Sequence, residues 1–306
     1  MRYVKKNNGL LRKPARIIYN FISGQREYTV AEWIRFFKVS KSGYYEHIKQ
    51  RESRKREEKE LKVEIKLIFD ESCGTYGPGR ICGILRKNGR KASYNKVNGY
   101  MAEMGLSSIH NRFKKLRSLT DSKKARGTGY PNLLRDVSIE KPRQAVCGDI
   151  TYLKSDEGWL YLCVVKDVFT SEILGVAMSE SMRKELMIQA FLNAQERYNL
   201  GKDIIFHSDR GSQYTSKEFR DLLRKYGIRQ SYSRIGMPGD NAWTESFFAT
   251  LKKECVHFRH FGTREELRQA VIAWVDFYNM RRIQAKLGYM PPREYAARLM
   301  AENAAA

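Results

Sequence analysis

Alternating or continuous runs of apolar residues dominate the second half of the chain, and they predict a mixed α/β domain. Three β-rich runs separated by short polar turns predict an antiparallel meander. Two helices with apolar stripes and two further short strands follow in alternation. In chain order these segments cover residues 144–153, 158–170, 172–179, 187–198, 203–209, 216–227 and 228–233.

This order of three strands, helix, strand, helix and strand predicts a five-stranded mixed sheet with helices on its faces, as in a ribonuclease-H-like core. Residues 240–254 predict another helix. The last clear helix begins with a capping box at Thr263 and Glu266 and carries an apolar stripe from Leu267 to Tyr278. We therefore expect an α/β catalytic domain over residues 143–306.

The pattern before residue 143 is helical and basic. Residues 1–27 show little periodicity, which predicts an extended or loosely packed arm. Two short helices over residues 30–37 and 40–50, around the break at 38–40, predict a first helix-turn-helix within residues 1–56.

A second helical DNA-binding domain is expected over residues 57–115, after which the Gly-, Ser- and Lys-containing stretch 116–142 predicts a linker. Its apolar face begins with Leu61, Ile65 and Ile68, and Ser93 is positioned to cap a helix. Its candidate DNA-binding side chains are Arg80, Arg86, Lys87, Arg90, Lys91, Lys96, Lys114 and Lys115.

The charge is distributed unevenly over the 306 residues, which carry 57 Lys and Arg against 34 Asp and Glu, a net charge of +23. Residues 1–142 contain 33 basic and 14 acidic residues, a net charge of +19. The remaining residues contain 24 basic and 20 acidic residues, a net charge of +4. Such an excess predicts a polyanionic partner. No apolar run approaches a membrane span of about 18 residues, and DNA is therefore expected rather than a membrane.

The five cysteines contain no CxxC pair, and no signal peptide is apparent. We expect a reduced, cytoplasmic and nucleoid-associated protein. His257 and His260 form an HxxH without a cysteine pair at zinc-ligand spacing, so a structural zinc site is not favoured.

Three acids occupy settings that fit a two-metal site. Asp149 lies in an apolar strand, Asp209 ends another strand before a polar turn, and Glu245 lies in a predicted helix, with 59 and then 35 residues between them. Carboxylates presented from two strands and a helix can hold two Mg²⁺ ions, or Mn²⁺ as a substitute, and such a pair cleaves and joins phosphodiesters.

Each acid has a plainer alternative. Burial of an unpaired acid in a strand is costly, which favours a ligand role for Asp149. Asp209 could instead stabilise a turn, and Glu245 could be a solvated helix acid. Asp167 and Asp240 are rival acids, the second as a helix cap.

Other polar residues near the three acids are weaker candidates. Lys252, seven residues after Glu245, could hold a DNA phosphate or be an ordinary surface lysine. His207 and Asn241 could hydrogen-bond to the carboxylates without binding the metal, although His207 could instead be a buried polar residue.

Several motifs together resemble the integrase-type transposases of bacterial insertion sequences, in particular the second-frame (OrfB) product of insertion-sequence family three. They are DITYL, HSDRGSQYTS, DNAWTESFFATLKKE and YNMRRIQAKLGYMPPREY, and the similarity spans roughly residues 57–296. The resemblance implies a retroviral-integrase-superfamily core whose D-D-35-E triad is Asp149, Asp209 and Glu245. It also implies a basic residue at Lys252.

The resemblance implies Mg²⁺-dependent nicking at an element's end and direct attack of the freed 3′-OH on DNA. Terminal inverted repeats, target DNA, a homo-oligomer and an upstream-frame protein are the implied partners. Gln284 departs from the family, which commonly has His there, and no sustained leucine heptad is present. Two other functions stay open: a DNA-binding regulator without catalysis, and a plain ribonuclease-H-like nuclease.

Overall fold

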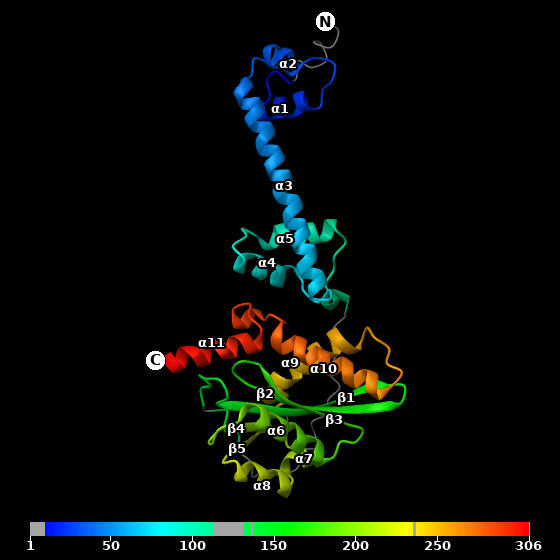
Figure 1. The fold of residues 1–306 in the computed structure, drawn as a ribbon, viewed down its shortest axis with the longest axis vertical. Coiled ribbons are helices and arrows are strands. Elements are labelled where there is room, and N and C mark those ends of the chain that lie inside the picture. The colour runs from blue at the N-terminus through cyan, green and yellow to red at the C-terminus, as the bar shows by residue number, and fades with distance from the viewer. Residues whose placement is uncertain (1–9, 113–130, 136, 235–236, 306) are drawn as a thin grey trace. The chain divides into compact units, whose positions relative to one another are not determined.

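A computed structural model describes residues 10–112, 131–135, 137–234 and 237–305. It divides into two compact units, Met1–Ile68 and Phe69–Ala306 (Figure 1). In the described part of the chain, no helix combines the length and apolarity that crossing a membrane requires.

The first unit is a small aromatic core built by three helices. These are α1 (Ala15–Ser23), α2 (Val30–Phe37) and α3 (Lys41–Glu71). Thr29 begins α2 as a capping box, because its side chain accepts from the Glu32 amide while the Glu32 carboxylate accepts from the Thr29 amide at 2.7 Å. Ile18, Ile22, Trp33, Phe37 and Tyr44 lie buried together.

Two expectations for this region are wrong. Residues 15–23 form α1 rather than an extended arm, because Ile18 and Ile22 lie one turn apart and bury one face against α2. The second helix of the first motif does not stop near residue 50. It continues for 31 residues as α3, since strong helix formers fill it and neither Gly nor Pro occurs between Gly43 and Gly74. The predicted boundary between residues 56 and 57 lies inside this helix.

The second unit begins with a helical region, formed by α4 (Pro78–Lys87), α5 (Tyr94–Glu103) and the 3-10 turn η1 (Ile109–Arg112). As expected, Ser93 caps α5 by accepting from the Lys96 amide. The buried side chains Ile81, Leu85, Val97 and Met101 supply the apolar faces of the two helices.

A five-stranded sheet follows, in the order β3-β2-β1-β4-β5. The strands are β1 (Ala145–Ser155), β2 (Gly158–Asp167), β3 (Ile173–Ser179), β4 (Ile205–Ser208) and β5 (Arg229–Tyr232). The first three pair antiparallel, and β4 is parallel to both β1 and β5. This arrangement confirms the predicted mixed sheet. Because β4 pairs with β1 only as far as Cys147, the rest of β1 has no strand partner on its β4 side.

Helices cover both faces of the sheet (Figure 1). The helices of this part are α6 (Lys184–Tyr198), α7 (Ser212–Thr215), α8 (Lys217–Lys225), α9 (Ala242–Leu251), α10 (Arg264–Met280) and α11 (Pro292–Ala305). Short helical turns are η3 (Pro238–Asn241), η4 (Lys252–Val256) and η5 (Ala285–Leu287). One face of the sheet packs against α6 and α8 around Phe191, Phe206 and Phe219, and the other against α9 and α10 around Phe247 and Val271.

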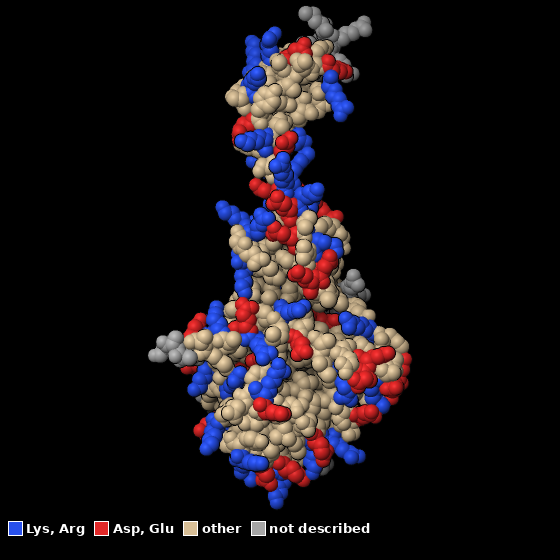
Figure 2. Space-filling model, in the orientation of Figure 1, with Lys and Arg blue, Asp and Glu red and all other residues tan. Residues whose placement is uncertain are grey.

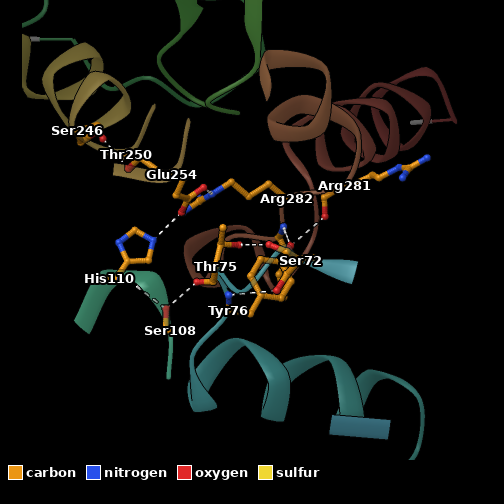
Figure 3. A network of polar contacts seen from close by, with 11 residues as sticks. Ser72, Thr75, Tyr76, Ser108, His110, Ser246, Thr250, Glu254, Arg281 and Arg282 are labelled. Carbon is orange, nitrogen blue, oxygen red and sulfur yellow. Dashed lines mark hydrogen bonds and ion pairs between the residues drawn. The ribbon is translucent and has the colours of Figure 1, made fainter. Parts of the chain in front are cut away.

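A buried polar network joins the helical region to the sheet-containing part of this unit (Figure 3). Glu254 receives two hydrogen bonds from Arg282, at 2.7 and 2.8 Å, and lies 2.6 Å from His110 Nε2. The Tyr76 hydroxyl donates to the Arg281 carbonyl at 3.1 Å and accepts from the Ile283 amide at 2.9 Å. The network therefore ties residues of the helical region to the segment that follows α10.

Candidate active site

Asp149 is held in place by groups from its own strand and from the start of α9. Its Oδ1 accepts from the Ile150 amide at 2.8 Å, and its Oδ2 accepts from Asn241 Nδ2 at 3.0 Å. The Thr244 hydroxyl lies 3.3 Å from the same Oδ2 and 2.7 Å from Asn241 Oδ1. The carboxylate is thus fixed in direction before any ligand binds.

Gly148 makes the approach of this strand to its neighbours possible. A Cβ at this position would lie 2.6 Å from the ring of Phe206, which is closer than carbon atoms approach. The absence of a side chain lets β1 lie against the aromatic core and sets the depth at which Asp149 projects.

Asp209 follows β4 directly and faces the same region. Its Oδ1 accepts from the Gly211 amide at 2.9 Å, so the turn role that the sequence allowed is present. Burial raises the pKa of Asp209, and the Gly211 hydrogen bond opposes that rise. The Asp209 carboxylate can stabilise the turn and bind a metal ion at the same time, because the Gly211 amide occupies only part of its acceptor capacity.

Glu245 lies in the first turn of α9 and is exposed, as is Asp209, whereas Asp149 is partly buried. The positive end of the helix dipole favours a carboxylate in this turn. Partial burial nevertheless raises the pKa of Glu245.

The charges of Asp209 and Glu245 act on Asp149. Burial is the main cause that raises the pKa of Asp149 to about 7, and the charges of Asp209 and Glu245 raise it further. No group of three His, Cys, Asp or Glu in the described residues is placed to hold one metal ion. An oxygen-only donor set of mutually repelling carboxylates nevertheless fits hard divalent cations, and two ions that share Asp149 would not need all three acids around one ion.

Lys252 begins a π-helical turn, η4, at the end of α9. Turns of this kind often mark functional sites. Its Nζ lies 5.1 Å from the ring centroid of Tyr152, a side chain of β1 that is 57% exposed. Burial lowers the pKa of Lys252, and the charge of Asp149 opposes this. The lysine is therefore a cation beside the carboxylates and not a remote surface residue.

The other candidate polar residues have structural partners. His207 lies buried between the hydroxyls of Ser231, at 2.8 Å, and Ser233, at 3.1 Å, and burial lowers its pKa to about 4. Asp167 accepts from backbone amides that include that of Arg143, at 2.9 Å, and Asp240 pairs with Arg234 at 3.0 Å. None of these three takes the place of a triad member.

The predicted DNA-binding side chains differ in their partners and in their exposure. Arg86 donates to the Ala92 carbonyl at 2.8 Å, and Lys87 pairs with Glu294 at 2.9 Å. Lys91, Lys96 and Arg90 are exposed, whereas Arg80 is partly buried; Lys114 and Lys115 lie outside the described residues. Basic and acidic side chains are interspersed on the face drawn in Figure 2.

Some residues around the site were missed at the level of sequence. The Thr244 hydroxyl contacts Asp149. Glu254, in the turn η4 after α9, bonds to Arg282 and His110. Lys166 lies only 2% exposed in β2, where a lysine inside the apolar run WLYLCVVKD was the available signal.

Comparison with known proteins agrees with this geometry. The Integrase core domain family matches residues 139–238, a second family of the same description matches residues 226–292, and the HTH-like domain family matches residues 55–114. The transposase for insertion sequence element IS904 of Lactococcus lactis is 36% identical over 249 residues, covering 80% of this chain and 97% of the relative. Transposase InsF of insertion sequence IS3A from Escherichia coli is 33% identical, covering 89% of this chain and 95% of the relative.

The chain belongs to this family of insertion-sequence transposases. It is a DDE-type enzyme of DNA transposition and integration. Its helix-turn-helix-like and integrase domains indicate DNA binding. Among solved structures, the HTLV-2 integrase catalytic core domain in complex with magnesium is similar at a TM-score of 0.39 and 21% identity, covering 51% of this chain and 97% of that one. The fold assignment depends instead on the sheet order and the matching families.

Proposed function

We propose that this transposase cleaves one strand at each end of an insertion element and transfers the freed 3′-OH to DNA, with Asp149, Asp209 and Glu245 as its metal ligands. The placement of these acids on a strand, at a strand end and on a helix supports the proposal, because, in addition to burial, the charges of Asp209 and Glu245 there raise the pKa of Asp149. The charges of Asp209 and Glu245 oppose ionisation of Asp149, and divalent cations bound by the three carboxylates would relieve that repulsion.

Bound Mg²⁺ ions would neutralise charge at the scissile phosphate and activate the attacking oxygen. The protein's own contribution is orientation. Asn241 and the Ile150 amide fix the two oxygens of Asp149, and Lys252 would bind a phosphate beside the ions. Water first breaks a phosphodiester and leaves a 3′-OH; that hydroxyl then attacks a second phosphodiester, forming one bond and releasing one 3′-OH.

The DNA-contact roles of Arg80, Arg86, Lys87, Arg90, Lys91, Lys96, Lys114 and Lys115 belong to the same proposal. So do recognition of terminal inverted repeats, assembly of at least a dimer on DNA, a possible upstream-frame partner and residence at the nucleoid. Two element ends must be held together for joint transfer, which favours an oligomer.

The test uses a labelled duplex of an element end, the full-length chain and Mg²⁺. We expect a nicked product with a 3′-OH, followed by joined products. Asp149→Asn, Asp209→Asn and Glu245→Gln should each lower both steps at least a hundredfold with DNA affinity retained. Asp221→Asn removes an acid of α8 that pairs with Arg224 on the surface and serves as the matched control.

The same assay separates the alternatives. Nicking that never leads to joining would favour a plain nuclease. DNA binding without cleavage in either Mg²⁺ or Mn²⁺ would favour a regulator.

A further inference from the structure

A cavity of ≈ 240 Å³ lies beside α9, which contributes Ser246, Phe247 and Thr250 to its lining. It is lined by four cationic side chains, Arg80, Lys166, Arg282 and Lys286, together with the hydroxyls of Ser246 and Thr250. The cations come from α4, β2 and the segment after α10, all within the second unit. No acidic side chain lines the cavity.

Most of this positive charge lacks a carboxylate partner. Arg282, which is 4% exposed, is neutralised by Glu254. In the described part of the chain, no carboxylate lies within ion-pair distance of Arg80, Lys166 or Lys286. Lys166, at 2% exposure, donates instead to the Trp243 carbonyl, and Lys286 donates to the Ser171 hydroxyl. Three cations without a direct ion pair therefore surround one small volume.

The cations are crowded enough to disturb one another. Burial lowers the pKa of Lys166 to about 8, and the charge of Lys286 adds to this lowering, whereas Cys147 and Asp167 oppose it. Burial also lowers the pKa of Arg80, with Arg282 as the next cause and Glu254 acting in the opposite direction. An anion between these groups would relieve both the repulsion and the loss of hydration.

A neutral donor completes the set. Gln284 also lines the cavity, and its buried Nε2 has no hydrogen-bond partner of acceptable geometry among the described residues. The nearby Tyr278 hydroxyl is close enough to feel this amide, since burial raises the pKa of Tyr278 to about 12 while Gln284 acts in the opposite direction. A buried amide donor without a well-formed hydrogen bond is costly, and an anionic oxygen would satisfy it.

We propose that this cavity binds a phosphoryl group, supplied by the backbone of DNA or by a free phosphate. Its volume exceeds that of a few water molecules, each of which occupies about 30 Å³ in the liquid. Guanidinium, ammonium, hydroxyl and amide donors together match a tetrahedral anion with several acceptor oxygens. Only the DNA source depends on the function proposed above.

The first test measures binding of inorganic phosphate to the full-length chain by calorimetry, with EDTA present and ionic strength held constant with chloride. Saturable binding is expected. Lys286→Gln should weaken it at least tenfold, and Gln284→Glu, which places a carboxylate in the cavity, should abolish it. Lys225→Gln, at an exposed lysine of α8, is the matched control and should leave it unchanged.

Phosphate that binds no better than chloride would overturn the proposal, as would equal affinity in wild type, Lys286→Gln and Gln284→Glu. Circular dichroism of each variant establishes that it is folded. Because no DNA is cut in this experiment, phosphate binding by a chain that fails to transfer strands would refute only the proposed function.

The second test identifies the source with duplex DNA titrated at several salt concentrations. If a DNA phosphate fills the cavity, Gln284→Glu should lower DNA affinity severalfold, the salt slope should fall by about one, and inorganic phosphate should compete with DNA. If DNA affinity is unchanged while phosphate binding is lost, the cavity is a site for free phosphate. Either result retains the phosphoryl site and decides what occupies it.

Discussion

Replacing Asp149 with Asn should make the metal-free protein more stable while destroying its activity. The pKa of Asp149 is raised from 3.8 to about 7 by burial and by its acidic neighbours. Ionising this group in the folded state at pH 8 therefore costs roughly 4 kcal/mol more than in the unfolded chain. Asn keeps the shape but carries no charge, and it loses one of two acceptor oxygens, which costs about 1 kcal/mol.

The expected net gain from Asp149→Asn is about 3 kcal/mol at pH 8, equivalent to a rise in Tm of very roughly 6–12 °C. Because the folded-state pKa is raised, the destabilisation by Asp149 begins as pH rises above 3.8 and is complete above about 7. At pH 5 the gain should shrink to about 1 kcal/mol or less, since the folded carboxyl is then mostly protonated.

The assay is thermal unfolding followed by circular dichroism, in EDTA at pH 5 and pH 8, with Asp221→Asn as the control at an exposed acid. Adding Mg²⁺ at pH 8 should stabilise the wild type but not Asp149→Asn, because a ligand raises stability only if its site is intact. A lower Tm in the variant, or an equal gain at both pH values, would show that the buried charge of Asp149 does not destabilise the fold.

Three further predictions concern the surroundings of the site. Glu254→Gln should destabilise the protein by about 3 kcal/mol in urea unfolding, because it leaves the buried Arg282 without its charge partner. Burial opposes the lowering of the Glu254 pKa, but His110 and Arg282 together outweigh it. The stability that Glu254 contributes is therefore present above its unfolded pKa and is lost as pH falls. Gly148→Ala should cost about 1–3 kcal/mol through the clash with the Phe206 ring, measured the same way. Lys252→Ala should lower strand cleavage about tenfold or more with little change in Tm, and an unchanged cleavage rate would remove Lys252 from the phosphate contact.

The sheet and the settings of the three acids could be predicted because each depends on local pattern. Alternating apolar residues specify strands, and an acid such as Asp149 inside one of them is conspicuous through its cost of burial. The helix that begins at Thr263 was equally readable from its capping box. These signals are all contained within a few residues of sequence.

The features that escaped prediction depend on distant partners or on competing local signals. The basic composition of residues 1–27 concealed the Ile18 and Ile22 pair of α1, which is apolar only on one face. Nothing near Glu254 in the sequence indicates that Arg282 and His110 will meet it. Lys166 likewise meets cations from two distant segments, Arg80 of α4 and Arg282 and Lys286 after α10.

The hydrogen bonds of Glu254 have a consequence for chimeric enzymes. Glu254 lies on the same run of helix as Glu245, yet one of its partners, His110, belongs to the helical region that matches the HTH-like family. Exchanging that region between relatives, in order to redirect which DNA end is recognised, would also change the support of the helix that bears Glu245, the proposed metal ligand. Recognition and chemistry in this transposase are therefore not interchangeable parts, and a productive exchange would have to carry His110, Glu254 and Arg282 together.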